Sequence, residues 1–249
     1  MRTTLLVAFL TATVTVELAA RTRGKTAKAA GWPVDRWSRF TAAAGGAVAI
    51  LVSAAGDAID RVTGVDNLGM LTGHLVGIVS VAGICSLMLA WTYPPSARPA
   101  ALRLRLAGAL AVAAAAIAMF VTVDHNGIDL TNEYAHVEGV AEYLLIINLY
   151  WAVTGIAVAR DCIPLAIDNA RAGHRRIATA QALIAAGGAA SAVWGITEGA
   201  FAAITRIWGN AWNVGVQDTI SSTSAGLFGA CIFSGIAACS IPTRVERAR

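Results

Sequence analysis

Carboxylates stand inside or beside long apolar stretches of this sequence, where charged side chains are otherwise rare. Asp57 and Asp60 are three residues apart, Glu138 and Glu142 are four apart, and Glu198 lies in a run of small and apolar residues. In a helix, each of the two pairs shares one face. A carboxyl group held in a low-dielectric environment stays protonated near neutrality and can donate its proton to a substrate. The pattern indicates general acid chemistry.

Two of these acids are the first candidates for the proton donor. Asp60 is expected at the C-terminal end of its helix, where a carboxylate opposes the helix dipole and capping does not account for it. Glu142 is expected more than a turn inside an apolar span, although its place near a helix N-terminus also favours a capping role. A second acid, Glu198 or Asp218, is expected to polarise the donor or to take the final proton. Asp218 is equally well placed to be a helix N-cap.

Aromatic side chains accompany the acids. Trp194 precedes Glu198 by four residues, so both lie on one helix face, and aromatic rings stabilise developing positive charge. The predicted substrate-binding residues are Trp194, Trp212, Phe201, His74 and Glu138. Trp194 is equally compatible with the aromatic belt of a membrane interface, and His74 with a hydrogen-bonded core histidine.

The elements that hold these residues are expected to be membrane-spanning helices. The chain of 249 residues is 57% hydrophobic and only 14% charged, and a helix needs about 20 apolar residues to cross a bilayer. The sequence predicts an all-α integral membrane bundle that fills residues 1–249 as a single domain. The seven predicted spans are Thr3–Ala20, Phe40–Ile59, Leu71–Tyr93, Leu106–Val123, Val137–Ala159, Ile177–Gly199 and Thr219–Ile241.

Basic residues set the expected orientation. Sixteen of the 19 lysines and arginines follow the first, third, fifth and seventh predicted spans, and positive residues accumulate in cytoplasmic loops. We therefore expect an outside N-terminus and a cytoplasmic C-terminus in a bacterial cytoplasmic membrane. The first span is expected to be an uncleaved helix, with a removed signal sequence as the alternative.

Acidic residues show the opposite distribution. Ten of the 15 fall in the outer half or the outer loops of this topology, and many lie in the stretch FVTVDHNGIDLTNEYAHVEGVAEYLL, Phe120–Leu145, with Asp124 and His125. This stretch is expected to form one wall of an acidic outer chamber. The alternative is that outer loops are simply polar, because acids constrain topology only weakly.

Several classes of membrane protein are excluded by missing motifs. The only lysines, Lys25 and Lys28, lie between the first two spans, so no span can hold retinal as a Schiff base. The sequence has neither the HExxH motif of metalloproteases nor the Asp-x-x-x-Asp pair of magnesium-diphosphate sites. Basic and aromatic residues do not alternate in the pattern that would indicate nucleic-acid binding. We predict no metal and no cofactor.

The segment AIDRVTGVDNLGMLTGHLVGIVSVAGICSLMLAWTYPP, Ala58–Pro95, and the later AEYLLIINLYWAV resemble a family of actinobacterial multi-pass membrane proteins described as putative transporters. The similarity covers roughly residues 40–200 and is carried by the Ile-Asp-x-x-Thr-Gly-Val-x-Asn-Leu run and the following histidine. It implies a seven-helix membrane protein. In size and helix number the chain is also similar to the small integral membrane terpene cyclases of fungal meroterpenoid and bacterial indole-sesquiterpenoid pathways, which use paired intramembrane acids.

These observations favour a membrane enzyme that acts on a lipophilic, isoprenoid-type substrate. The expected reaction is a metal-independent cyclisation started by protonation, of the isomerase or lyase type, in contact with membrane lipid. A transporter or proton-coupled permease that uses the same acids as a relay is the alternative. That alternative predicts polar residues through the inner half, whereas the inner halves of the fourth, sixth and seventh predicted spans offer mainly alanine, glycine, valine and serine. A seven-helix sensor or scaffold is the third hypothesis. The sequence sets no oligomeric state.

Overall fold

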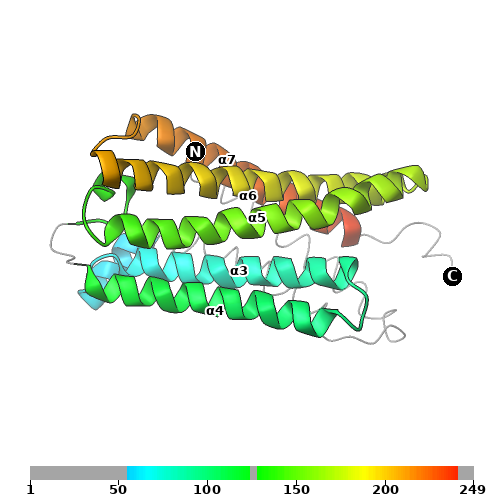
Figure 1. The fold of residues 1–249 in the computed structure, drawn as a ribbon, viewed down its shortest axis with the longest axis horizontal. Helices are drawn as coiled ribbons and strands as arrows, with labels where there is room; N and C mark the ends of the chain where they lie inside the picture. The colour runs from blue at the N-terminus through cyan, green and yellow to red at the C-terminus, as the bar shows by residue number, and fades with distance from the viewer. Residues whose placement is uncertain (1–54, 124–127, 241–249) are drawn as a thin grey trace.

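The structure, a computed structural model, describes residues 55–123 and 128–240 (Figure 1). All the regular secondary structure of these residues is helical, so the all-α class is confirmed for this part of the chain. Residues 55–63 are helical and lead into α3. The elements that follow are α3 (Leu68–Thr92), α4 (Arg98–Thr122), the short 3-10 helix η2 (Asn132–Tyr134), α5 (Val140–Arg171), α6 (Arg175–Trp208) and α7 (Val214–Ser240).

Five of the described helices, α3 to α7, are long and apolar enough to cross a membrane. The prediction of a multi-pass membrane protein is confirmed to that extent. The predicted span Thr3–Ala20, most of the span Phe40–Ile59, and the residues Asp124 and His125 lie outside the described residues. Seven spans and their orientation stay predictions.

The helices are longer than the predicted spans. α4 begins at Arg98 and not at Leu106, because Pro99 fits the first turn of a helix, where its missing N–H has no partner to lose. α5 continues past Ala159 to Arg171, through Pro164. α6 runs to Trp208 and ends at Gly209, whose φ of 79° is a left-handed conformation that suits glycine. Span prediction counts only apolar residues, whereas the helices continue with polar side chains at both ends.

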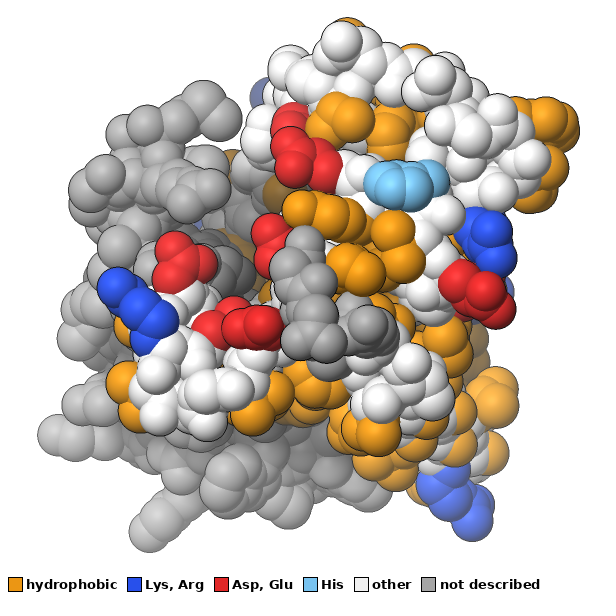
Figure 2. Space-filling model, turned by 90° about the vertical axis from the view of Figure 1, so that its left-hand side faces the viewer, with side chains coloured by type: hydrophobic (Ala, Val, Ile, Leu, Met, Phe, Trp, Pro, Cys, Tyr) orange, Lys and Arg blue, Asp and Glu red, His pale blue; other side chains and the backbone are white. Residues whose placement is uncertain are grey.

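The five long helices run antiparallel to their neighbours in the chain, so their termini gather at two ends of an elongated bundle (Figure 1). We call the end formed by the starts of α3, α5 and α7 the acidic end. It carries Asp57, Asp60, Asp66, Asp129, Glu133, Glu138, Glu142 and Asp218. We call the opposite end the basic end. It carries Arg98, Arg103, Arg105, Arg160, Arg171, Arg175 and Arg176. Figure 2 shows acidic side chains around exposed hydrophobic ones at the acidic end.

Glycines bring α5 and α6 into close contact. A Cβ atom on Gly195 of α6 would lie 2.4 Å from the carbonyl oxygen of Asn148 and 2.5 Å from the nitrogen of Ala152, both in the backbone of α5. Gly155 of α5 makes an equally close approach, because its Cβ would lie 2.5 Å from the carbonyl oxygen of Gly188. Small residues at such crossings allow two backbones to meet, as is typical of membrane helices.

Gly195→Ala is expected to destabilise the bundle by about 1–3 kcal/mol, because the added methyl group must push two backbones apart. Gly199→Ala is the matched control. It lies one turn further along α6, and its nearest neighbours, two α5 side-chain atoms, are 3.8 Å from the added Cβ. Thermal unfolding in detergent should show a lower midpoint for Gly195→Ala only. Equal midpoints for the two variants would contradict this packing.

Candidate functional site

Asp60 caps the start of α3. Its carboxylate accepts hydrogen bonds from the backbone nitrogens of Asn67, at 2.9 Å, and Gly69, at 2.7 Å. Asn67 has a φ of 63°, and its side chain binds the backbone of Ile128 and Leu130. A capping role was not expected for Asp60, because a carboxylate at the C-terminal end of a helix cannot cap that same helix. The structure shows a cap on the next helix, and the role of Asp60 as a proton donor stays a prediction.

Asp60→Ala is expected to cost about 0.5–2 kcal/mol of stability, the usual value of a lost N-cap. Hydrogen exchange at the amides of Asn67 and Gly69 should accelerate, because both lose their acceptor. Asp57→Ala, an exposed acid one turn earlier, is the control and should leave these amides unchanged. Unchanged exchange in Asp60→Ala would show that the cap contributes nothing.

Glu142 has a similar local role. One carboxylate oxygen accepts a hydrogen bond from the backbone nitrogen of Gly139, the N-cap of α5, at 2.7 Å, which is the glutamate half of a capping box. The other oxygen lies 3.4 Å from Nε of Arg206, and the side chain is 42% exposed. Glu142 is therefore in the first turn of its helix, not a turn and a half inside it. Its role as a proton donor stays a prediction.

Three other predicted acids, Asp57, Glu138 and Asp218, are exposed at the acidic end. Asp218 lies within α7 and not at its N-cap, because this helix begins at Val214. Among the described residues, none of these three carboxylates takes part in a hydrogen bond or an ion pair. They add negative charge to the acidic end.

Glu198 differs from the other predicted acids because it is buried, with 8% of its surface exposed. The Ser221 hydroxyl of α7 donates a short hydrogen bond to its Oε1 atom. Ser221 in turn accepts a bond from Nε2 of Gln217, 3.0 Å away, and Oε1 of Gln217 accepts one from Nε1 of Trp212, also at 3.0 Å. A chain of three hydrogen bonds thus leads from the buried carboxyl group to a tryptophan that is 36% exposed.

Phe201 and Trp212, both predicted to bind substrate, lie together beside this chain. Their ring centroids are 5.4 Å apart in an edge-to-face arrangement. Thr205, two turns after Glu198 on the same face of α6, is 8% exposed, and its hydroxyl has no hydrogen-bond partner among the described residues. An unpaired buried hydroxyl is unusual and can be satisfied by a polar group of a ligand.

An aromatic layer lies one to two turns deeper in the bundle than Glu198. Trp194 of α6 stacks on Trp151 of α5, with centroids 5.4 Å apart, and Phe228 of α7 meets Trp151 edge-on at 6.3 Å. A Cβ on Gly77 of α3 would lie 3.0 Å from the Trp151 ring, so Trp151 packs against three helices at once. Trp194 therefore points toward α5 inside the bundle.

His74 forms a second polar pair near the acidic end. Its Nδ1 atom lies 2.7 Å from the hydroxyl of Tyr143, which is fully buried in α5. The two rings are tilted, with centroids 5.6 Å apart. This hydrogen bond agrees with the alternative interpretation of His74, in which it is a hydrogen-bonded histidine of the core.

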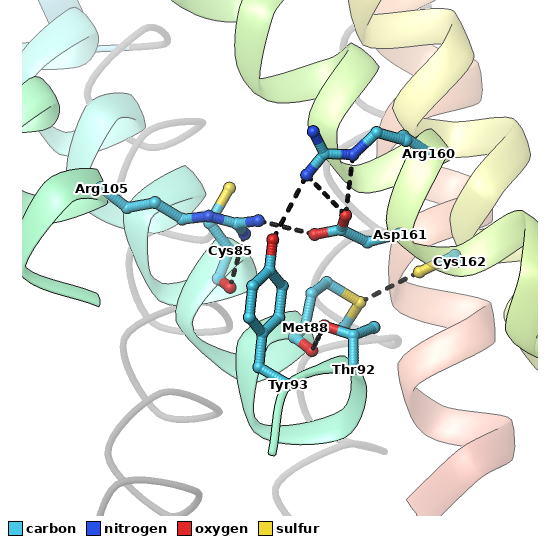
Figure 3. A network of polar contacts seen from close by, with 8 residues as sticks. All are labelled: Cys85, Met88, Thr92, Tyr93, Arg105, Arg160, Asp161 and Cys162. Atoms are coloured by element: carbon cyan, nitrogen blue, oxygen red, sulfur yellow. Dashed lines mark hydrogen bonds and ion pairs between the residues drawn. The ribbon is translucent and has the colours of Figure 1, made fainter. Parts of the chain in front are cut away.

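A third polar group, at the basic end, was missed by the sequence analysis (Figure 3). The side chain of Asp161, on α5, is 6% exposed. Its carboxylate forms ion pairs with Nη2 of Arg105, at 2.6 Å, and with Nη2 of Arg160, at 2.8 Å. Arg105 also donates to the carbonyl oxygen of Cys85 at 3.0 Å, and Arg160 lies 3.4 Å from the hydroxyl of Tyr93. The predicted span ended at Ala159, so Asp161 was counted as a loop residue.

Within residues 55–123 and 128–240, no three His, Cys, Asp or Glu side chains come close enough together to hold a metal ion. No family model, no curated protein and no solved structure matches the chain. The resemblance to actinobacterial membrane proteins and the analogy with membrane terpene cyclases therefore remain untested predictions.

Proposed function

We propose that the chain is a membrane-embedded enzyme that cyclises a lipophilic, isoprenoid-type substrate after protonation by Glu198. The observation that carries this proposal is the burial of Glu198 between a hydrogen-bond chain and an aromatic layer. The basic end is proposed to face the cytoplasm of a bacterium, so that Glu198 acts in the outer half of the membrane. The preferred donor moves from Asp60 and Glu142 to Glu198, because the first two carboxylates bind helix N-termini.

The proposed reaction needs one proton in and one proton out. Glu198 donates its proton to a terminal alkene carbon or to an epoxide oxygen, and the new cation is attacked by a neighbouring double bond, which closes a ring. The rings of Trp194 and Trp212 are proposed to stabilise the positive charge. The Glu198 carboxylate takes a proton from a carbon next to the final cation, which forms the last double bond and restores the acid, so the product is an isomer of the substrate. The Ser221 hydroxyl stabilises the carboxylate that remains on Glu198.

The direct test is incubation of the purified protein in vesicles with linear prenylated aromatic compounds and their epoxides. Extracts are compared by mass spectrometry with extracts from protein-free vesicles. A product of unchanged mass and different retention is the expected result. Recovery of every substrate unchanged would contradict the proposal.

The basic end supplies an observation in favour of the rival function, a proton-coupled permease. Asp161 and Arg105 place ionisable side chains within α5 and α4 at the basic end, where the predicted spans did not include them. A relay would have to join this group to Glu198. Along α3, however, the buried side chains between the level of His74 and that of Cys85 are the apolar Ile78, Val81, Ala82 and Ile84, with Ser80 as the one buried polar side chain. We therefore place the enzyme first, and proton uptake by protein-containing vesicles tests the rival.

A further inference from the structure

Three arginines from two helices meet at the C-terminal end of α3. Arg105 and Arg160 share the carboxylate of Asp161, and Nε of Arg98 donates to the backbone carbonyl of Tyr93 at 2.8 Å. The Tyr93 hydroxyl contacts Arg160, so Tyr93 touches two of the three arginines. We call Arg98, Arg105, Arg160, Tyr93 and Asp161 the arginine cluster.

The arginine cluster carries more positive than negative charge. Arginine stays protonated in proteins, so the cluster holds three guanidinium groups and one carboxylate, and only Arg105 and Arg160 pair with that carboxylate. The nearest acid along α5 is the exposed Asp168, two turns further on. Positive charge that is partly removed from water is stabilised by an anion. Among the described residues, the cluster therefore has an excess of positive charge that an anionic ligand can balance.

One guanidinium of the cluster is open to such a ligand. The Arg160 side chain is 65% exposed, and its Nε and Nη2 atoms donate to Asp161 and Tyr93. Its Nη1 atom points away from the other residues drawn in Figure 3. Asp161 thus fixes the orientation of Arg160 without covering it. A guanidinium held in this way loses little freedom when it binds a phosphate group.

Exposed apolar residues lie close to Arg105 and Arg160 in the sequence. On α4, Leu104 is 76% exposed and Leu106 is 42% exposed, and on α5, Ile156 and Ile163 are 52% and 49% exposed. These residues flank Arg105 and Arg160 in the sequence and suit contact with acyl chains. Tyrosine beside arginine at the end of a membrane helix is typical of the headgroup region. The ligand that fits both features has an anionic head and apolar tails.

We propose that the arginine cluster binds the phosphate headgroup of an anionic membrane phospholipid, with Arg160 as its main contact. Basic residues between membrane helices at the cytoplasmic side are a known way to bind such headgroups. A free phosphate ion shares the charge but not the tails, and the exposed leucine and isoleucine residues favour the lipid. This proposal does not depend on the enzymatic function proposed above.

The test measures thermal unfolding of the protein in an uncharged detergent. Phosphatidylglycerol, phosphatidylcholine and inorganic phosphate are added in separate titrations. Phosphatidylglycerol is expected to raise the unfolding midpoint of the unchanged protein by about 2–4 °C or more, because it binds the folded state. Phosphatidylcholine and inorganic phosphate are expected to give smaller shifts.

Two matched variants locate the site. Arg160→Gln is expected to reduce the shift to the level of phosphatidylcholine. Arg103→Gln removes the same charge from the same end and should keep the full shift, because Arg103 is exposed and, among the described residues, donates to Pro99 of its own helix. If Arg160→Gln does not fold, Arg98→Gln is used in its place and should lower the shift.

The alternative outcomes are clear. Equal loss of the shift in Arg160→Gln and Arg103→Gln would overturn the proposal in favour of unspecific attraction to the basic end. A shift with inorganic phosphate as large as that with phosphatidylglycerol would assign the site to a free anion. Equal shifts of the unfolding midpoint with phosphatidylglycerol and phosphatidylcholine would show that the arginine cluster does not bind an anionic headgroup.

Discussion

Glu198→Gln is expected to lower the rate of cyclisation by a factor of about 100 or more, the usual contribution of a general acid, while the bundle stays folded. Glutamine has the shape of glutamate, and its side-chain oxygen can still accept the hydrogen bond from Ser221. It cannot donate a proton to an alkene. The measurement is the initial rate of product formation by protein reconstituted in vesicles, followed by mass spectrometry.

Two controls accompany this variant. Glu133→Gln removes an exposed acid from the same end of the bundle and is expected to keep the full rate. Ser221→Ala removes the hydrogen bond to the carboxyl group together with the acceptor of Gln217, and is expected to cause a smaller loss than Glu198→Gln. A rate in Glu198→Gln equal to that of Glu133→Gln would remove Glu198 from the mechanism and return Asp60 and Glu142 to first place.

Asp161→Asn is expected to cost about 3–5 kcal/mol of stability, because it leaves the Arg105 guanidinium without a counter-charge. The Arg105 side chain is only 17% exposed, so water does not replace the lost partner. Asp168→Asn is the matched control, since it removes the same charge from an exposed position on the same helix. Thermal or denaturant unfolding in detergent measures both.

A double variant separates charge from packing at this position. Arg105→Met combined with Asp161→Leu removes both buried charges and is expected to regain most of the lost stability, because apolar replacements of a buried ion pair are often neutral. If Asp161→Asn is as stable as Asp168→Asn, the ion pair of Arg105 and Asp161 contributes nothing to the fold. If the double variant is no more stable than the single one, packing and not charge is the cause.

The helical core of the fold was predictable because a bilayer requires long apolar runs. The observed α3 (Leu68–Thr92) differs from the predicted Leu71–Tyr93 by a few residues at most. The ends of α5 and α6 were not predictable from hydropathy, because these helices continue through arginines and through Pro164. The close approach at Gly195 needs the partner backbone to be seen, since small residues in a helix do not reveal what they face.

The candidate site was predictable only in part. Glu198 stood out because an acid in an apolar run of a membrane helix is costly unless it has partners. Those partners were missed, although Gln217 and Ser221 are four residues apart in an apolar helix, a spacing that places both on one face. Trp151 was missed because its contacts with Gly77, Trp194 and Phe228 join four helices that are distant in the sequence.

Asp60 shows a different limit of sequence reasoning. Its position at the end of one helix excludes a cap on that helix, but a reversal of the chain brings it to the start of the next one. That reversal depends on the left-handed conformation of Asn67, which asparagine adopts more readily than most residues. A turn centred on asparagine was the signal that could have identified the cap.

The measurement that tests the proposed chemistry most directly is cyclisation of an alkene substrate in heavy water. Protonation of a carbon by Glu198 places a solvent-derived hydron on that carbon, where it does not exchange. The account predicts a cyclic product with one carbon-bound deuterium, formed by the unchanged protein and lost in Glu198→Gln. A cyclic product without deuterium, or an unchanged substrate, would contradict protonation by this carboxyl group.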